Sequence, residues 1–261
     1  MTDVPRMRFH EDRARALSFG GIAAQYDRAR PSYPAALIDD LMAWHPHAVL
    51  DVGCGTGKAA RLMAERGCSV LGVEPDPLMA SVARDHGITV ENGTFEEWDP
   101  RGRRFDLVVS GQAWHWVDPR IGPAKAAGMV GEGGHVTVFW NTGRHDPEMR
   151  AALQAVYERL APGIAPTTTS LRPVTVDGMD RLAEFQRSGR FSSVEARAYP
   201  WDADYDRVRW LDYAATHSDH VRLPDAQRRV LLDAVGDVID AHGGHLAYHF
   251  STVAILATAG G

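Results

Sequence analysis

The segment VLDVGCGTG at residues 49–57 constrains the fold of this chain more than any other part of the sequence. A short apolar run passes into three glycines spaced two apart, and residues 58–66 follow with helical periodicity. Glycines in this arrangement allow a tight turn and let backbone N–H groups approach a ligand that a Cβ would hold away. The segment therefore predicts a buried strand, a turn able to bind a ligand and a helix, in that order.

Predicted strands and helices alternate from this segment onward to about residue 140. The patterns predict strands at 48–51, 69–74, 88–91, 105–110 and 135–140, and helices at 34–44, 58–66, 77–86 and 119–130. Such alternation is typical of a doubly wound parallel sheet with right-handed crossovers and helices on both faces. Ligands bind such sheets beyond the carboxyl ends of the strands, so functional residues are expected there.

The regular alternation of predicted strands and helices ends after residue 141. Helices are predicted at 146–160, 177–188, 204–216 and 224–241, a Pro- and Thr-rich loop at 161–170, and strands at 191–199 and 246–257. We therefore predict an α/β fold with a doubly wound, seven-stranded, mostly parallel sheet, an antiparallel finish and a helical cap. The expected segments are an N-terminal lid at 1–33, the α/β core at 34–141, a helical cap at 142–190, and 191–261, which completes the core.

Composition narrows the partners and the compartment. The 261 residues carry a net charge of −6, with 28 basic and 34 acidic residues, which argues against a nucleic-acid partner. Only two cysteines occur, so a disulfide framework is not expected. The N-terminus lacks the apolar region of a signal peptide, and no apolar stretch approaches the roughly 20 residues that span a bilayer. We predict a cytoplasmic protein that acts on a small molecule, with no membrane partner.

Three cofactor classes use glycine loops of this kind, and glycine spacing separates them. A dinucleotide fingerprint would need its third glycine at Lys58, and a phosphate-binding loop would need glycine at Val52 and a hydroxyl residue at Ala59. The remaining pattern, Asp51 followed by alternating glycines, suits a ligand without a pyrophosphate whose positive amino group meets the carboxylate. The alternative is a turn that merely joins a strand to a helix.

The ends of the second and third predicted strands add two signals. Glu74 follows Asp51 by 23 residues, where α/β nucleotide sites place a carboxylate that accepts both ribose hydroxyls. The segment ENGTFE at 91–96 can present N–H groups to an adenine edge and an apolar wall to its face, a weak signal by itself.

Together these residues resemble the class I S-adenosylmethionine (SAM)-dependent methyltransferases, within the small-molecule branch of trans-aconitate methyltransferase-like proteins. The resemblance covers about residues 18–141 and is loose over 142–245. It rests on FGGIAAQYDRARPSYP (19–34), VLDVGCGTG (49–57), GVEPDPLMA (72–80), NGTFEEW (92–98) and SGQAWHW (110–116).

The resemblance implies a role for each matching residue. The methionine end of SAM would lie against Asp51, Gly53, Gly55 and Gly57, with Tyr26 and Arg30 closing over its carboxylate. Glu74 would hold the ribose, and Pro75, Asp76, Thr94, Phe95 and Glu96 would border the adenine. Gln112 and Ala113 would lie beside the sulfonium. SAM is thus the expected cofactor and S-adenosylhomocysteine the expected product.

His115 is the candidate catalytic residue, because a histidine can accept a proton near neutral pH. Alternatively, it orders its loop by binding a backbone carbonyl. Trp114 and Trp116 are candidate substrate-binding residues, with core packing as the alternative. His217 and His220 have helical i, i+3 spacing but no third ligand, so we expect surface polar residues and no metal site.

These expectations combine into methyl transfer to a small molecule, at an oxygen of a carboxylate or hydroxyl. Two alternatives remain open: an enzyme that uses bound SAM without methyl transfer, such as a dehydratase or cyclase, and a non-catalytic SAM-binding module. A nicotinamide dehydrogenase is disfavoured by the glycine spacing.

Overall fold

The computed structural model describes residues 9–12, 15, 17–164 and 174–260, with only the backbone of 9 and 174–180. Its seven strands form one sheet in the order β3-β2-β1-β4-β5-β7-β6. They are β1 Ala48–Val52, β2 Ser69–Glu74, β3 Thr89–Asn92, β4 Phe105–Gly111, β5 Val130–His145, β6 Phe191–Asp206 and β7 His245–Ala259. β7 pairs antiparallel with β5 and β6, and the other pairs are parallel. The predicted α/β fold class is confirmed.

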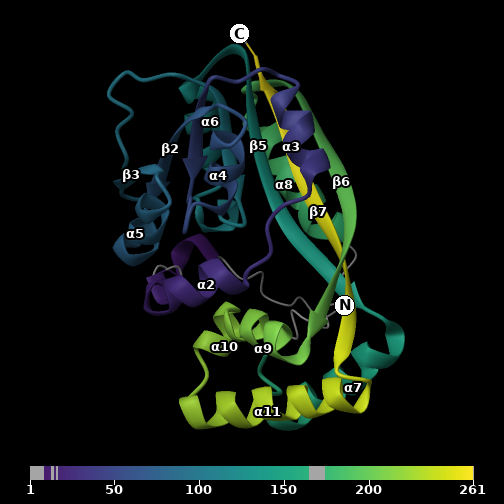
Figure 1. Cartoon of the computed structure of the whole chain (residues 1–261). Helices are drawn as coiled ribbons and strands as arrows, with labels where there is room; N and C mark the ends of the chain where they lie inside the picture. The colour runs from purple at the N-terminus through teal and green to yellow at the C-terminus, as the bar shows by residue number, and fades with distance from the viewer. Residues whose placement is uncertain (1–8, 13–14, 16, 165–173, 261) are drawn as a thin grey trace.

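Helices cover both faces of this sheet (Figure 1). The helices of the sheet region are α3 Ala35–Met42, α4 Lys58–Ala64, α5 Pro77–Asp85, α6 Gly122–Met129 and α8 Val174–Arg187. Successive strand residues point to opposite faces, so Val49 packs with α3 and α4 while Leu50 packs with α6 and α8. Both side chains are fully buried, which is why the parallel strands are apolar on both faces.

The last three strands are longer than the sequence pattern indicated. β5 continues to His145 instead of ending at residue 140, and β6 continues to Asp206 instead of residue 199. Their extensions are held by antiparallel pairing, with His145 opposite Tyr248 and Asp206 opposite His245. The extension of β5 reads NTGRH, which has no apolar alternation, so periodicity alone could not show it.

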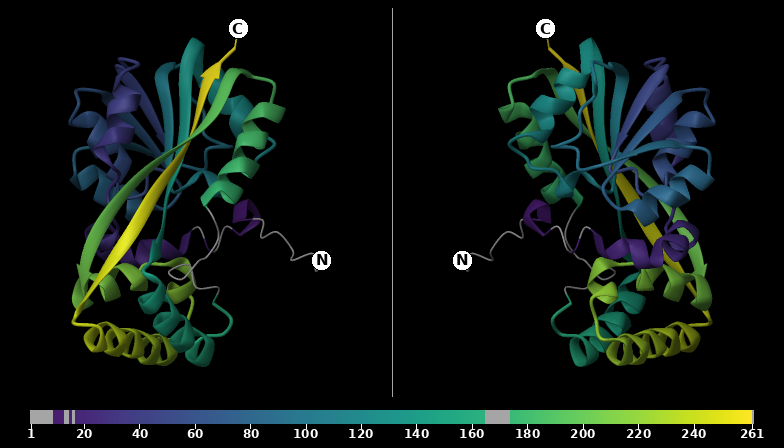
Figure 2. Two further views of the ribbon diagram at one scale, coloured as in Figure 1. Left: turned by 90° about the vertical axis from the view of Figure 1, so that its right-hand side faces the viewer. Right: turned by 90° about the vertical axis from the view of Figure 1, so that its left-hand side faces the viewer.

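Four helices gather at the far end of these long strands, and we call them the cap (Figures 1 and 2). They are α7 Pro147–Leu160, α9 Arg207–Ala215, α10 Ser218–Val221 and α11 Asp225–Ala241. α7 packs on α11, and their core includes the buried side chains Leu153, Tyr157, Trp210, Leu231 and Val235. α8 lies within the range expected for a cap, 142–190, but it packs on β6 and β7 instead, with Phe185 fully buried.

The N-terminal segment lies between the α/β body and the cap (Figure 1). It comprises η1 Phe9–Glu11, η2 Leu17–Ile22 and α2 Ala23–Ala29. Its side chains contact both neighbours: Asp27 pairs with Arg61 of α4, and Gln25 donates to Asp212 of α9. Among the described residues, no helix is long and apolar enough to cross a membrane.

Candidate functional site

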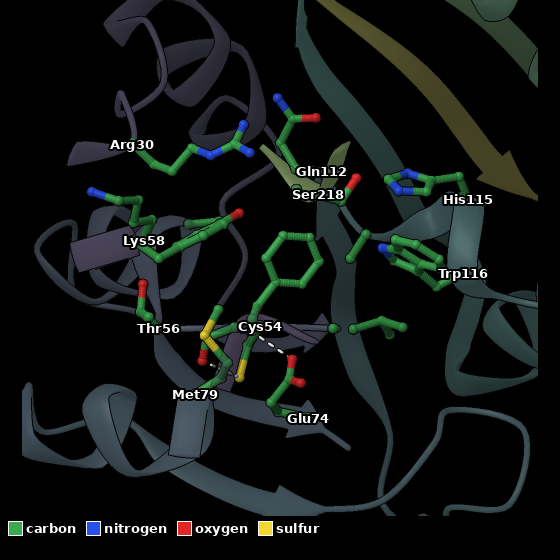
Figure 3. Close-up of a pocket in the computed structure, with 18 of the residues that line it drawn as sticks. Arg30, Cys54, Thr56, Lys58, Glu74, Met79, Gln112, His115, Trp116 and Ser218 are labelled. Carbon is green, nitrogen blue, oxygen red and sulfur yellow. Dashed lines mark hydrogen bonds between the residues drawn. The ribbon is translucent and has the colours of Figure 1, made fainter. Parts of the chain in front are cut away.

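A cavity of about 700 Å³ opens at the carboxyl ends of β1, β2 and β4, with the N-terminal segment and the cap forming its other walls (Figure 3). Most of the residues singled out in the sequence line it. They are Tyr26, Arg30, Asp51, Gly53, Gly55, Glu74, Pro75, Thr94, Phe95, Glu96, Gln112, Ala113, His115 and Trp116. The cavity therefore lies at the sheet edge where an α/β fold binds its ligands.

The glycine loop requires glycine at the positions that face the cavity. Gly53 and Gly55 have φ angles of +66° and +55°. A Cβ on Gly53 would lie 2.5 Å from the Cβ of Ala113, which closes the space to any larger residue. Gly57 does not line the cavity; it precedes α4 with φ +83°, and a Cβ there would crowd Ala83 at 3.2 Å. Its expected contact with the methionine end is therefore corrected to a structural role.

Asp51 places a buried, unsatisfied carboxylate on the cavity floor. The residue is 1 % exposed, and neither carboxylate oxygen makes a hydrogen bond of ordinary geometry within the described part of the chain. Burial raises the pKa of Asp51 to about 7, opposed by the nearby Ala60 N–H and reinforced by the charge of Glu74. An orphaned buried carboxylate is costly unless a ligand partners it, so this site suits a ligand with a positive group.

Glu74 is held in place by backbone donors. Its Oε2 accepts from the Gly55 N–H at 2.8 Å and its Oε1 from the Asp76 N–H at 2.9 Å. Burial raises the pKa of Glu74 to about 7, although both N–H groups lower it. Each oxygen keeps a second lone pair, so the carboxylate can accept two further hydroxyls. The resemblance placed Asp76 beside the adenine, but Asp76 does not line the cavity. It caps α5 instead, by accepting from the N–H groups of Leu78 and Met79.

The turn after β3 is fixed by its own side chains. Thr94 Oγ1 donates to Glu97 at 3.1 Å, and Glu96 accepts from the Asp118 N–H at 2.7 Å. The Phe95 side chain is 4 % exposed and borders the cavity. The turn thus offers an apolar surface at the position where the sequence analysis expected the adenine.

Gln112 occupies a strained position at the end of β4. Its φ of +59° is unusual for a residue other than glycine, and such outliers gather at functional sites. The Gln112 N–H donates to the Phe139 carbonyl at 2.8 Å, and its side-chain amide donates to the Asn141 carbonyl at 3.0 Å. These bonds hold Gln112 and the adjoining Ala113 against the glycine loop.

Trp114 and Trp116, both in η3 Trp114–Trp116, lie on opposite sides of their turn. Trp116 lines the cavity, whereas Trp114 is fully buried in the sheet core. The indole N–H of Trp114 donates to Glu184 at 3.0 Å, and its ring packs 5.4 Å from that of Phe185. This placement contradicts the expectation that Trp114 contacts a substrate. A short helical turn cannot direct both side chains to one side.

The lone pair of His115 is occupied by a hydrogen bond from Trp140. The indole N–H of Trp140 donates to its Nδ1 at 3.3 Å. Because an indole N–H only donates, Nδ1 holds the lone pair and the neutral ring carries its hydrogen on Nε2. Burial, together with the charges of Arg181, Arg15 and Arg30, lowers the pKa of His115 to about 3. The basic nitrogen of His115 is therefore engaged by Trp140, which argues against the catalytic role expected for it.

Arg30 links the cofactor side of the cavity to the cap. Its guanidinium lies 5.1 Å from the ring centroid of Tyr26 and 5.4 Å from that of Tyr213, and it donates to the Thr216 carbonyl at 2.9 Å. The Nε of Arg30 is buried without a partner among the described residues. Arg30 can therefore still donate to an anionic group of a ligand.

The cap supplies cavity residues that sequence reasoning missed. His217, Ser218 and Asp219 line the cavity, and Arg15 bonds to both Ser218 and Asp219 from the N-terminal segment. Figure 3 labels Ser218 among the residues that line the cavity.

The expectation of a polar surface at His217 and His220 is wrong. His220 is fully buried, with Nε2 2.9 Å from the Tyr157 hydroxyl. Nothing in the HSDH spacing signals this burial, which arises because the cap folds α10 toward the N-terminal segment.

Comparison with known proteins agrees with the fold and the site. A family model described as a methyltransferase domain matches residues 49–134. An uncharacterized methyltransferase of Mycobacterium tuberculosis is 30% identical over 93% of this chain and 96% of its own length. The trans-aconitate 2-methyltransferase of Mycobacterium marinum is 34% identical over 34% of each chain. A solved structure described as a putative type II methyltransferase from Anaeromyxobacter dehalogenans superposes with a TM-score of 0.64, at 22% identity over 88% of this chain and 97% of that one.

The chain belongs to the class I SAM-dependent methyltransferases. The family implies SAM as the cofactor, and the cavity fits that group on observations of its own. The orphaned carboxylate of Asp51 matches an ammonium, the free lone pairs of Glu74 match ribose hydroxyls, and Gly53 leaves the space that a side chain would fill.

Proposed function

We propose that this methyltransferase methylates an oxygen atom, in a carboxylate or a hydroxyl group, of a small molecule bound beneath the cap. The observation that carries the proposal is the extent of the cavity. It continues from the Asp51 carboxylate to the side chains of Trp116 and His217, so one space adjoins both the cofactor wall and the cap. That space gives an acceptor a place beside the cofactor.

In this proposal the cofactor wall binds and orients SAM. Asp51 receives its ammonium, Arg30 its carboxylate and Glu74 its ribose hydroxyls, while Thr94, Phe95, Glu96 and Pro75 border the adenine. Tyr26 closes the methionine end, and Gln112 and Ala113 lie beside the sulfur. When bound, SAM supplies a methyl group already activated by a positively charged sulfur. The chain therefore contributes mainly alignment and exclusion of water.

The charges near the acceptor compartment support an oxygen acceptor with acidic character. Arg15, Arg30 and Arg181 all lower the pKa of His115, so three cations act on this part of the cavity. Arg181 is neutralised in part by Glu184 at 2.7 Å, and Arg15 by Asp219. The relative from Mycobacterium marinum is named for trans-aconitate, which is consistent with an acidic acceptor here.

Thermal unfolding with SAM, with S-adenosylhomocysteine and with NAD tests the cofactor assignment. A ligand at about one hundred times its Kd stabilises the folded chain by about 2.7 kcal/mol, which raises the midpoint by a few degrees. We expect this rise with SAM and S-adenosylhomocysteine but not with NAD. An equal rise with NAD, or no rise with any of them, would contradict the assignment.

Acceptor methylation is tested by incubating the protein with SAM and pools of small carboxylic acids and hydroxyl compounds. Release of S-adenosylhomocysteine together with a 14-dalton mass gain on an acceptor supports the proposal. Conversion of an acceptor without S-adenosylhomocysteine would indicate the dehydratase or cyclase chemistry instead. Binding of SAM with no second ligand found in the cavity would indicate a binding module.

A further inference from the structure

His217 and His115 carry their lone pairs on different ring nitrogens, Nε2 in His217 and Nδ1 in His115. His217 is the residue that precedes α10, and its Nδ1 lies 3.1 Å from the carbonyl oxygen of Ala214. A carbonyl oxygen only accepts, so Nδ1 carries the hydrogen and the neutral ring has its lone pair on Nε2. The Tyr213 ring lies edge-on to the imidazole at 4.7 Å between centroids and fixes its plane.

The surroundings keep this imidazole neutral. Burial lowers the pKa of His217 well below its ordinary value, and the charges of Arg30 and His220 lower it further. The carbonyls of Ala214 and Tyr213 oppose these effects only in part. The lone pair on Nε2 is therefore present at neutral pH, in a half-buried side chain that lines the cavity.

We propose that His217 is the catalytic base, contacting the acceptor and taking the proton of an acceptor hydroxyl through Nε2. This inference rests on the proposed function and sharpens it, because a carboxylate has no proton to lose whereas an alcohol or phenol does. The acceptor oxygen would bond to the methyl carbon as the carbon–sulfur bond of SAM breaks, with that electron pair left on the sulfur of S-adenosylhomocysteine. The O–H electron pair would stay on the acceptor oxygen, and the proton would pass to Nε2 of His217. The imidazolium then returns its proton to solvent. The acceptor atom is thus a hydroxyl oxygen.

Of His115 and His217, which both line the cavity, only His217 is assigned as a base in this proposal. The Trp140 indole N–H occupies the lone pair on Nδ1 of His115, whereas the Ala214 carbonyl accepts the hydrogen on Nδ1 of His217. A backbone carbonyl that binds one ring nitrogen and so orients the other is the usual way in which a basic histidine is positioned.

The first test reads the tautomers directly, without activity. In protein labelled with ¹⁵N-histidine and saturated with S-adenosylhomocysteine, long-range ¹H–¹⁵N spectra distinguish the two neutral tautomers. His217→Asn and His115→Asn assign the signals. We expect hydrogen on Nδ1 in His217 and on Nε2 in His115. Hydrogen on Nε2 of His217 would overturn the proposal.

The same spectra probe contact with a hydroxyl. 4-Hydroxybenzoate and benzoate differ by one hydroxyl group and serve as matched probes at saturating concentration. We expect 4-hydroxybenzoate to shift the Nε2 resonance of His217 and benzoate to leave it in place. Equal effects of the two probes, or none, count against the hydroxyl contact. Methyl transfer to acceptors is measured separately in the acceptor screen. Failure of this inference leaves that transfer intact, whereas failure of the proposed function means that no acceptor gains a methyl group.

Kinetics with a hydroxyl acceptor from the screen supply the second test. His217→Asn keeps a donor for the Ala214 carbonyl but lacks an atom at the Nε2 position. We expect kcat to fall roughly 100-fold with KM changed by less than about threefold, because a general base contributes at least that much to kcat. His220→Asn is the control, since His220 is buried outside the cavity wall; it should lower stability and keep kcat. A kcat loss shared by both variants would assign His217 a structural role.

Discussion

The two walls of the cavity are built in different ways. On the sheet side, Asp51, Gly53 and Glu74 act at strand ends, and backbone N–H groups fix the geometry. On the cap side, side chains far apart in the sequence, such as Arg15 and His217, meet only after folding. The first wall is suited to one invariant cofactor, whereas the second can change with the acceptor while the sheet stays the same.

The hydrophobic cores behind the two walls differ in the kind of side chain that they bury. The sheet core is largely aliphatic, with Leu50, Val108 and Val138 among its fully buried residues. The cap core is rich in aromatic side chains, including Trp210 and Tyr157. Parallel strands present short branched side chains to both faces, whereas a small cap must bury much area with few residues, which aromatic side chains do. Perturbing one core should therefore leave the other wall's ligand in place.

The largest effect is expected from Trp210→Ala in the cap. Trp210 is fully buried and packs on Tyr205 and Tyr248 at ring-centroid distances of 5.3 and 5.1 Å. Truncation should lower the free energy of unfolding by about 3–5 kcal/mol, measured by urea denaturation. S-Adenosylhomocysteine affinity should change by less than about tenfold, because Asp51 and Glu74 lie on the sheet and Arg30 is the assigned cofactor residue that contacts the cap, through Tyr213 and Thr216.

Trp210→Phe is the matched control. The indole N–H of Trp210 is buried without a partner among the described residues, so removing it leaves no acceptor unsatisfied. The phenylalanine variant should lose much less stability than the alanine variant. A large loss of cofactor affinity in Trp210→Ala would show that the two walls are coupled through their cores.

Asp51→Asn tests the cofactor wall in turn. The substitution keeps the shape but removes the charge that we assign to the ligand ammonium. A hydrogen bond to a charged group contributes about 1.5–3 kcal/mol, so S-adenosylhomocysteine should bind roughly 10- to 100-fold more weakly in calorimetry. Removing a buried orphaned carboxylate should not lower the stability of the free protein. Unchanged affinity would contradict the role assigned to Asp51.

The affinity for the cofactor should fall as pH falls, because Asp51 and Glu74 become protonated. The pKa values of Asp51 and Glu74 are both raised to about 7, so the two carboxyls take up protons as pH falls below that value. An ammonium ligand prefers the carboxylate, so the affinity for S-adenosylhomocysteine should fall by up to about tenfold per pH unit below pH 7. Asp51→Asn should flatten this dependence, and a steeper one in the variant would refute the assignment.

The smallest effect concerns the join between the long strands and the cap. His249 lies 2.8 Å from Asp202 and 3.2 Å from Asp146, and both carboxylates raise its pKa. A raised folded-state pKa stabilises the protein below the ordinary value of about 6.5, and this is lost as pH rises through the folded value. These side chains are solvent-exposed, so the gain is small. The midpoint difference between wild type and His249→Gln should shrink from acid to alkaline pH.

The contrast between the walls also explains what the sequence could predict. Asp51, Gly53, Gly55 and Glu74 were found because strand ends and glycines occur at fixed spacing along one chain segment. His217 was not, because its place depends on how the cap folds. Trp114 was misplaced because two tryptophans separated by one residue give no sign of which side each faces. The domain limits, the cytoplasmic location and the absence of nucleic-acid and membrane partners stay predictions.

The continuity of the long strands has a mechanical consequence. β5, β6 and β7 run unbroken from the body into the cap, with ladder pairs from His135 opposite Thr258 to His145 opposite Tyr248. A rotation of the cap away from the sheet would have to bend three hydrogen-bonded strands together. The N-terminal helices are instead fastened mainly by side chains such as Asp27 and Arg30. The three paired strands therefore set the distance between the two walls, whereas the described N-terminal helices are joined to both walls by side-chain contacts.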